Sequence, residues 1–112
     1  MSDVVSQGQN AVVIDQRDNV AVATYQLEAG AEARYPMPDG TLASVTATDD
    51  IPLFHKIALV NIPKGEKVVK YGEFIGVATT DIKRGQHVHT HNCESSDDLK
   101  DAVVTNTSAV AV

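Results

Sequence analysis

A short motif recurs along the chain and constrains its fold more than any other feature of the sequence. An aliphatic residue is followed three positions later by glycine, and three positions after that by another apolar residue. Full copies lie at residues 62–68 and 82–88, a looser copy lies at 27–33, and in a fourth, at 51–57, Phe54 replaces the glycine. Because glycine readily adopts the positive φ of tight turns, each copy predicts a strand end, a turn and a new strand. We therefore expect short strands that change direction often.

The segments between these motifs also favour strands. Runs of small and β-branched apolar residues predict strands near residues 10–15, 20–25, 41–48, 56–60 and 68–80. No segment has helical periodicity long enough for a βαβ unit, and we find no phosphate-binding loop, dinucleotide-binding turn or nucleophile elbow. The expected fold class is all-β and compact, with room for one or two helical turns in residues 97–104 after a Ser96 cap.

Length and composition fit a single domain. The chain has 112 residues, of which 43% are hydrophobic, and these are mainly alanine and valine. A modest single core is feasible at this size. Residues 1–9 are polar and predict a flexible N-terminus, whereas residues 10–93 contain all the motifs. We place the domain at residues 10–93 and expect an acidic C-terminal extension or tail at residues 94–112.

Charge and cysteine content limit the partners and the compartment. The net charge of −6 argues against nucleic acid, whose phosphates require a basic surface. Residues 56–84 are locally basic, which suits an acidic substrate or partner, although a solvated charged sheet face gives the same pattern. The single cysteine, Cys93, excludes an intrachain disulfide and fits a reducing compartment. The N-terminus does not resemble a signal peptide and no apolar run is long enough to cross a membrane, so we expect a cytoplasmic protein.

Three of the four histidines lie at alternate positions, His87, His89 and His91. In an extended strand their side chains would project from the same face. Imidazoles grouped in this way can bind a metal, bind an anion when protonated, or move protons. The fourth histidine, His55, lies far away in the sequence beside Lys56. The interpretation of this histidine strand depends on whether the fold brings His55 to it.

Four segments together carry a resemblance to a known family. They are DNVA at residues 18–21, IPLFHKIAL at 51–59, VKYGEFIGVA at 69–78 and GQHVHTHN at 85–92. Their order and spacing resemble the SAF domain of the altronate/galactarate dehydratase family, and the resemblance extends over residues 10–92. It implies a small β-clip fold, which occurs in that family either as the N-terminal domain of a long enzyme or as a separate small subunit.

The resemblance also implies an activity. Members of the family are lyases that eliminate water from acidic sugar derivatives such as altronate or galactarate, using a divalent metal such as iron or manganese. A related branch, the sulfolactate sulfo-lyases, has a separate small subunit and releases bisulfite. Because this chain ends soon after the last motif, we expect a small subunit in a hetero-oligomer with a large catalytic subunit. Such a subunit would not be active alone, and its metal would be shared with or held by the large subunit.

The resemblance implies roles for the histidines. We predict that His55, His89 and His91 are catalytic, and that His89 and His91 bind the metal, with His87 a weaker candidate. Imidazole is a common ligand of divalent metals, and neighbouring residues on one face of a strand can coordinate the same ion. The alternative is a surface strand whose histidines are solvated.

Four further residues are predicted to bind the substrate: Lys56, Lys70, Tyr71 and Asn92. Each has a structural alternative, namely surface lysines, a packed tyrosine with its hydroxyl bonded, and an asparagine that closes a turn. The chain departs from its relatives at Phe54, where they usually have glycine, and a positive φ there would strain the phenylalanine. Cys93 is expected to be a small packing residue rather than a nucleophile.

Other classes of function remain open. Within the lyase hypothesis we rank dehydration of a sugar acid first and desulfonation of sulfolactate second. A non-enzymatic β-clip binding module would work without a large subunit. A small metal-binding protein would hold a metal with the histidine strand alone.

Overall fold

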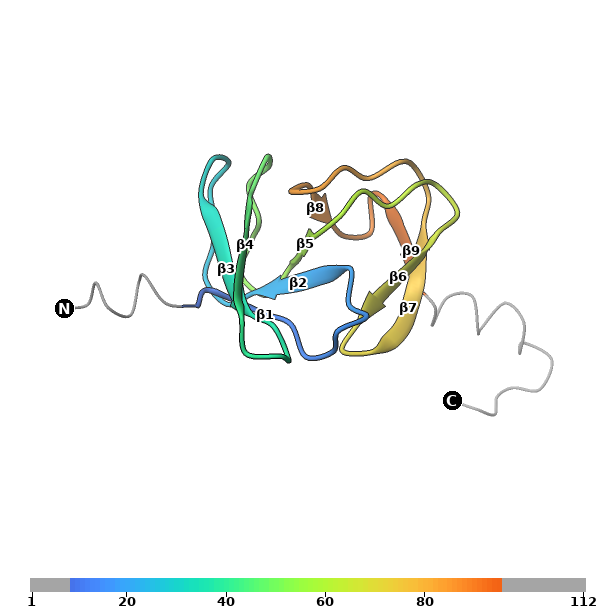
Figure 1. The fold of residues 1–112 in the computed structure, drawn as a ribbon. Coiled ribbons are helices and arrows are strands. Elements are labelled where there is room, and N and C mark those ends of the chain that lie inside the picture. Colours follow the sequence, from blue (N-terminus) through green and yellow to red (C-terminus); the bar gives the residue numbers. More distant parts are fainter. Residues whose placement is uncertain (1–8, 96–112) are drawn as a thin grey trace.

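The fold consists of short antiparallel strands. A computed structural model describes residues 9–95, where it has nine strands and no helix (Figure 1). The strands are β1 (Ala11–Val12), β2 (Val20–Ala23), β3 (Glu32–Pro36), β4 (Leu42–Thr46), β5 (Lys56–Ala58), β6 (Lys67–Lys70), β7 (Glu73–Ala78), β8 (His87–Val88) and β9 (Cys93–Ser95). The all-β prediction is confirmed, and the helical turns predicted in residues 97–104 lie outside the described residues. Within residues 9–95, no helix is available that could span a membrane.

The strands form a central sheet with a smaller sheet on each side. The central sheet has the order β1-β2-β5-β8, the second sheet is the β3–β4 hairpin, and the third has the order β6-β7-β9. Figure 1 shows the β3–β4 hairpin on one side of the central strands and β6, β7 and β9 on the other. The last strand, β9, continues to Ser95, past the domain end that we placed at residue 93.

The four copies of the sequence motif pair two by two. Leu27 bridges to Ile51, and Ile62 bridges to Ile82. The two backbone hydrogen bonds between Ile62 and Ile82 are 2.7 and 2.8 Å long. The turn position of every copy has a positive φ, and these positions are Gly30, Phe54, Gly65 and Gly85. The predicted turns are therefore confirmed, and each is held by a partner copy that lies far away in the sequence.

Each pair of motifs flanks one hairpin, so the chain consists of two similar halves. In the first half the motifs enclose β3–β4, and in the second they enclose β6–β7. The strands that end the halves, β5 and β8, pair antiparallel through Lys56 with Val88 and Ile57 with His87. Lys56 and His87 hold the same position in the motif, so this register is the one that a local two-fold relation between the halves produces. One residue further along, the same register sets His55 opposite His89.

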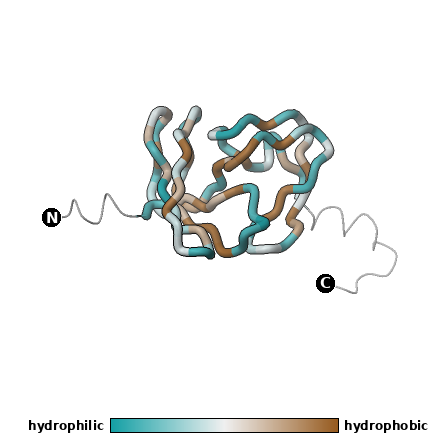
Figure 2. Tube along the Cα trace, viewed as in Figure 1, coloured by the Kyte–Doolittle hydropathy of each residue, from teal (hydrophilic) through white to brown (hydrophobic). Residues whose placement is uncertain are grey.

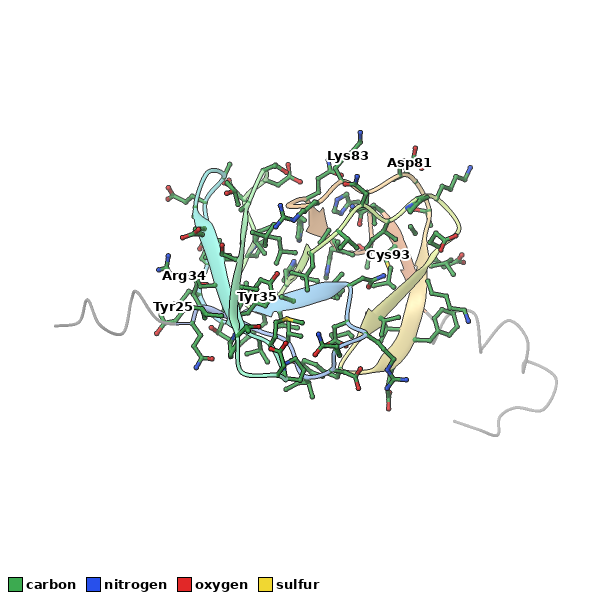
Figure 3. All side chains as sticks on the ribbon, viewed as in Figure 1. Tyr25, Arg34, Tyr35, Asp81, Lys83 and Cys93 are labelled. Atoms are coloured by element: carbon green, nitrogen blue, oxygen red, sulfur yellow. The ribbon has the colours of Figure 1, made fainter. Side chains whose placement is uncertain are left out.

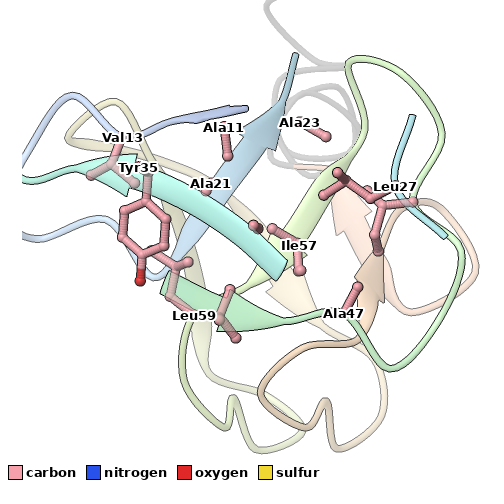
Figure 4. Close-up of a cluster of buried hydrophobic side chains, with 12 residues drawn as sticks. Ala11, Val13, Ala21, Ala23, Leu27, Tyr35, Ala47, Ile57 and Leu59 are labelled. Atoms are coloured by element: carbon pink, nitrogen blue, oxygen red, sulfur yellow. The ribbon is translucent and has the colours of Figure 1, made fainter. Parts of the chain in front are cut away.

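Two apolar clusters form the core, one in each half. The first gathers side chains of β1 to β5, including Tyr35 and Ile57 (Figure 4). The second gathers side chains of β5 to β8, including Val68 and Val88, together with Val20 of β2. Figure 2 shows apolar residues along the central strands and hydrophilic residues at the turns. The largest fully buried side chains are Ile51, Ile57, Ile62, Ile82, Val20, Val68 and Val88, and nearly all are motif positions. Burying one such side chain stabilises the fold by about 1.5–3 kcal/mol.

A buried aspartate joins the first turn of the chain to the β6–β7 hairpin. The backbone N–H of Asp18 donates to the carbonyl of Asp15 at 3.0 Å, which confirms the turn predicted at residues 16–19. The Asp18 carboxylate also accepts a hydrogen bond from the Gly72 N–H, at 2.7 Å. Next to it, the Asn19 side chain accepts a bond from the Val69 N–H at 2.8 Å. These bonds fix the hairpin that forms one wall of the site described below.

Candidate functional site

The histidine segment is a strand followed by a tight turn. The strand β8 ends at Val88, and the carbonyl of His89 accepts hydrogen bonds from the N–H groups of Asn92, at 3.1 Å, and Cys93, at 2.9 Å. The extended strand that we predicted through His91 is therefore wrong. The cause is the turn, which carries the chain from β8 to β9.

The side chain of Asn92 closes this turn. It is buried, and its carbonyl oxygen accepts a bond from the His89 N–H at 3.0 Å. Its amide nitrogen donates to the carbonyl of His87 at 2.8 Å. The carboxamide thus fixes the backbone of two histidines, which is the structural alternative to the substrate contact predicted for this residue.

The pairing of β5 with β8 brings His55 to the histidine segment. The His55 Nδ1 and His87 Nε2 atoms lie 2.8 Å apart, within hydrogen-bonding distance. The rings of His55 and His89 stack with their centroids 4.0 Å apart. One ring nitrogen from each of His55, His87 and His89 lies within 4.8 Å of the other two. We call these three residues the histidine trio.

His91 lies beside the histidine trio rather than in it. Its ring is tilted against that of His87, with the centroids 5.1 Å apart, and it is exposed. Among the described residues, the nitrogens that converge belong to His55, His87 and His89. The structure thus groups His89 with His55 and His87, whereas we had expected it to act together with His91.

Burial and the neighbouring histidines lower the pKa of two members of the trio, His87 and His89. Burial is the main cause that lowers the pKa of His87 to about 4, and the neighbouring histidines lower it further, against a small opposing effect of Asp49. The pKa of His89 is also lowered, first by burial and then by His55 and Lys56. A neutral imidazole offers a lone pair to a metal, which a protonated one cannot.

The donor set of the trio fits a transition metal. Metal–imidazole bonds of about 2.0–2.1 Å place neighbouring ligand nitrogens about 3.3 Å apart in a tetrahedral site. The trio's nitrogens lie within 4.8 Å of one another, so small side-chain rotations suffice. Three protein ligands leave further positions open for water or substrate, as in catalytic sites. In the described part of the chain no carboxylate belongs to the group, and an imidazole set suits iron better than manganese.

An open pocket of about 600 Å³ adjoins the trio and shares His89 with it. Its lining comes from three parts of the chain: β5, the β6–β7 hairpin, and the turn with β9. The lining residues are Lys56, Lys70, Tyr71, Glu73, Phe74, Ile75, His89, Thr90, Cys93 and Ser95. Three of the four predicted substrate-binding residues therefore lie in one pocket.

The hairpin residues Glu73, Phe74 and Ile75 are not among the site residues predicted from the sequence. They line the pocket because the β6–β7 hairpin folds back toward β5, which only a long-range pairing decides. One feature of the sequence could have indicated these hairpin residues. The segment that contains Lys70 and Tyr71 continues directly into a second strand.

The two lysines of the pocket lie near each other, and the lining contains one carboxylate, that of Glu73. Burial is the main cause that lowers the pKa of Lys56, and the charge of Lys70 lowers it further. Arg17 and Arg34 form ion pairs with Asp15 and Glu32. The Lys70 ammonium instead lies 5.1 Å from the ring centroid of Tyr71. With two lysines and one glutamate, the lining carries an excess of positive charge.

Cys93 lines the pocket from β9. Figure 3 shows it across the central strands from Arg34 and Tyr35. Burial is the main cause that raises the pKa of its thiol. A raised pKa keeps the thiol protonated near neutral pH, which suits a packing residue and not a nucleophile.

Phe54, directly before His55, has a φ of 67°. The predicted condition for strain is therefore met, because this left-handed conformation costs an L-residue about 1–2 kcal/mol. The side chain is 69% exposed, so burial compensates little. The turn that directs His55 toward His87 and His89 thus contains a strained residue.

Comparison with known proteins identifies the family of the chain. The sequence model of the altronate/galactarate dehydratase SAF domain matches residues 9–96. The chain belongs to this family. Altronate dehydratase of Escherichia coli (strain K12) is 41% identical to it over 85 residues, which make up 76% of this chain and 16% of that enzyme. The chain thus spans only a small part of the dehydratase.

Other members of the SAF family match over most of their own length. The (2R)-sulfolactate sulfo-lyase subunit alpha of Paracoccus pantotrophus is 49% identical over 51 residues, covering 46% of this chain and 76% of that subunit. The protein of the same name from Chromohalobacter salexigens is 34% identical over 86 residues, covering 75% of this chain and 92% of that subunit. The relatives are dehydratases and a sulfo-lyase, so the resemblance stated from the motifs is confirmed at the level of a lyase family.

Proposed function

We propose that this chain is the small subunit of a two-subunit lyase and that it contributes the histidine trio to an active site completed by a large catalytic subunit. The reaction is β-elimination of water from an acidic sugar derivative. The observation that carries the proposal is the convergence of three imidazoles from two halves of the chain beside a pocket lined by two lysines. Elimination next to a carboxylate requires an anion site, a base, and assistance to the leaving group.

A second polypeptide is needed because the described part of the site is incomplete. The pocket is open to solvent, and no carboxylate joins the trio within residues 9–95. Water must be excluded for electrostatic catalysis to be strong. The sulfo-lyase relatives are alpha subunits, and the region that matches the dehydratase is a small fraction of that enzyme. Both facts support a role beside a larger catalytic part.

The residues of this chain would divide the work. His55, His87 and His89 would hold a divalent metal, with iron the better fit. Such a metal supplies Lewis-acid assistance to the departing group. His91, exposed and outside the trio, is free to move a proton. Asn92 keeps the turn closed so that His87 and His89 stay in position.

A second candidate is the small subunit of a sulfolactate sulfo-lyase, which would release bisulfite. The matches that cover 76% and 92% of the alpha subunits favour it. Both reactions eliminate a leaving group beside a carboxylate, so the same trio and pocket would serve either one.

Co-purification of the tagged chain from its source cell tests the proposal. We expect a larger polypeptide in fixed ratio, and a complex that dehydrates altronate or galactarate or desulfonates sulfolactate. Replacing both His55 and His89 with alanine should abolish turnover while the complex remains assembled. The matched control is Lys83→Ala, which removes an exposed side chain outside the pocket and should leave turnover unchanged. A chain that purifies alone, or a double variant with normal turnover, would contradict the proposal.

A further inference from the structure

The pocket beside the trio is lined by two lysines, Lys56 and Lys70, and by a single carboxylate, that of Glu73, so its lining carries an excess of positive charge. Lys56 projects from β5 and Lys70 from the end of β6, and both are partly buried. They come from different sheets and different halves of the molecule, yet their charges are close enough to interact. Partly buried ammonium groups that repel each other are unfavourable without a counter-ion. This arrangement favours an anion in the space between them.

The other lining residues restrict what that anion can be. Tyr71 and Thr90 add hydroxyl groups, and His89 adds an imidazole, so several donors surround the same space. Phe74 and Ile75 give the pocket an apolar wall that suits a carbon chain. A volume of about 600 Å³ falls in the range of small-molecule sites. Ammonium groups act as point charges and accept planar and tetrahedral oxyanions alike.

We infer that Lys56 and Lys70 form an anion subsite that binds the carboxylate or sulfonate group of a small hydroxy acid, with the rest of the ligand directed toward His89 and the trio. The ligand is thus held at its acid end by one half of the chain and by the hairpin of the other. The description of this ligand as the substrate rests on the proposed function. The anion subsite itself does not.

The test is an NMR titration of the whole chain with acetate and with methanesulfonate. Chloride at the same ionic strength is the reference, because salt screens surface charges without specific binding. We expect saturable shifts of the backbone amide signals of Lys56, Lys70, Tyr71 and Thr90 with at least one of the two anions. The anion that binds more tightly identifies the acid group that the subsite prefers.

Charge-removing variants identify the subsite. Lys56→Gln and Lys70→Gln should each weaken binding by about tenfold or more, the effect of losing a charge-assisted hydrogen bond. Lys64→Gln and Lys83→Gln are matched controls, because both lysines are exposed on motif turns outside this pocket and should leave the affinity unchanged. A dispersed amide spectrum of each variant shows that it is folded. The two pocket variants test the subsite independently of each other.

Shifts no larger than those in chloride, or equal losses in the controls and the pocket variants, would overturn the anion subsite. The titration needs no partner and no turnover. If the chain binds anions as expected but purifies alone, the subsite stands and the proposed function fails. If the complex is active but the chain binds no anion, the subsite is refuted while the proposed function stands.

Discussion

The strained turn at Phe54 gives the sharpest stability prediction. The residue has a φ of 67° and precedes a histidine of the trio. Replacing it with glycine or with alanine removes the same exposed ring, so the difference between these two variants reports on the backbone alone. Glycine tolerates this φ, whereas alanine retains the Cβ atom that disfavours it.

The expected difference follows from two opposing effects. The left-handed conformation strains alanine but not glycine, which favours the glycine variant by about 1–2 kcal/mol. The greater freedom of glycine in the unfolded chain favours alanine by about 0.5–1 kcal/mol. Phe54→Gly should therefore be more stable than Phe54→Ala by about 0.5–1 kcal/mol. This corresponds to a melting temperature higher by about 2–8 °C in a domain of this size.

Urea and thermal unfolding followed by circular dichroism measure the difference. The control position is Val60, which is also exposed but does not have a positive φ. There the order should reverse, with Val60→Ala more stable than Val60→Gly by about 0.5–1 kcal/mol. A Phe54→Ala variant at least as stable as Phe54→Gly would refute the reasoning, because the turn would then not hold a left-handed residue.

Two further predictions concern acid stability and close packing. The pKa of His87 is lowered to about 4, so between about pH 6.5 and pH 4 the unfolded chain binds a proton that the folded chain does not, and the free energy of unfolding should fall as the pH drops through this window. His87→Gln should flatten that fall in urea unfolding curves, and an unchanged slope would contradict the assignment. A Cβ atom at Gly76 would collide with the backbone carbonyl of Glu94, so Gly76→Ala should destabilise the domain by about 2–3 kcal/mol. Gly65→Ala meets no atom within 4 Å and should cost only about 1 kcal/mol for its positive φ, so equal losses at the two positions would exclude the steric cause.

Local requirements of the backbone are visible in the sequence, and the fold class follows from them. The motif glycines at 30, 65 and 85 all have the positive φ that their spacing predicted. The aliphatic positions of the same motif are buried, as their fixed spacing from the turns implied. Both features depend on residues only a few positions apart. The sequence therefore determined the turns, the short strands and the all-β class.

The site depended on pairings that no local pattern contains. The contact between His55 and His87 joins residues 32 positions apart and exists because β5 pairs with β8 in one register. The pocket forms because the β6–β7 hairpin faces β5, which brings Lys70 near Lys56. The alternation of histidines correctly marked the segment, but the turn closed by Asn92 ended the strand and left His91 outside the trio. The sequence by itself determined which residues could do chemistry. The tertiary structure decided which of them meet, because the burial of two cores fixes the strand register throughout residues 9–95.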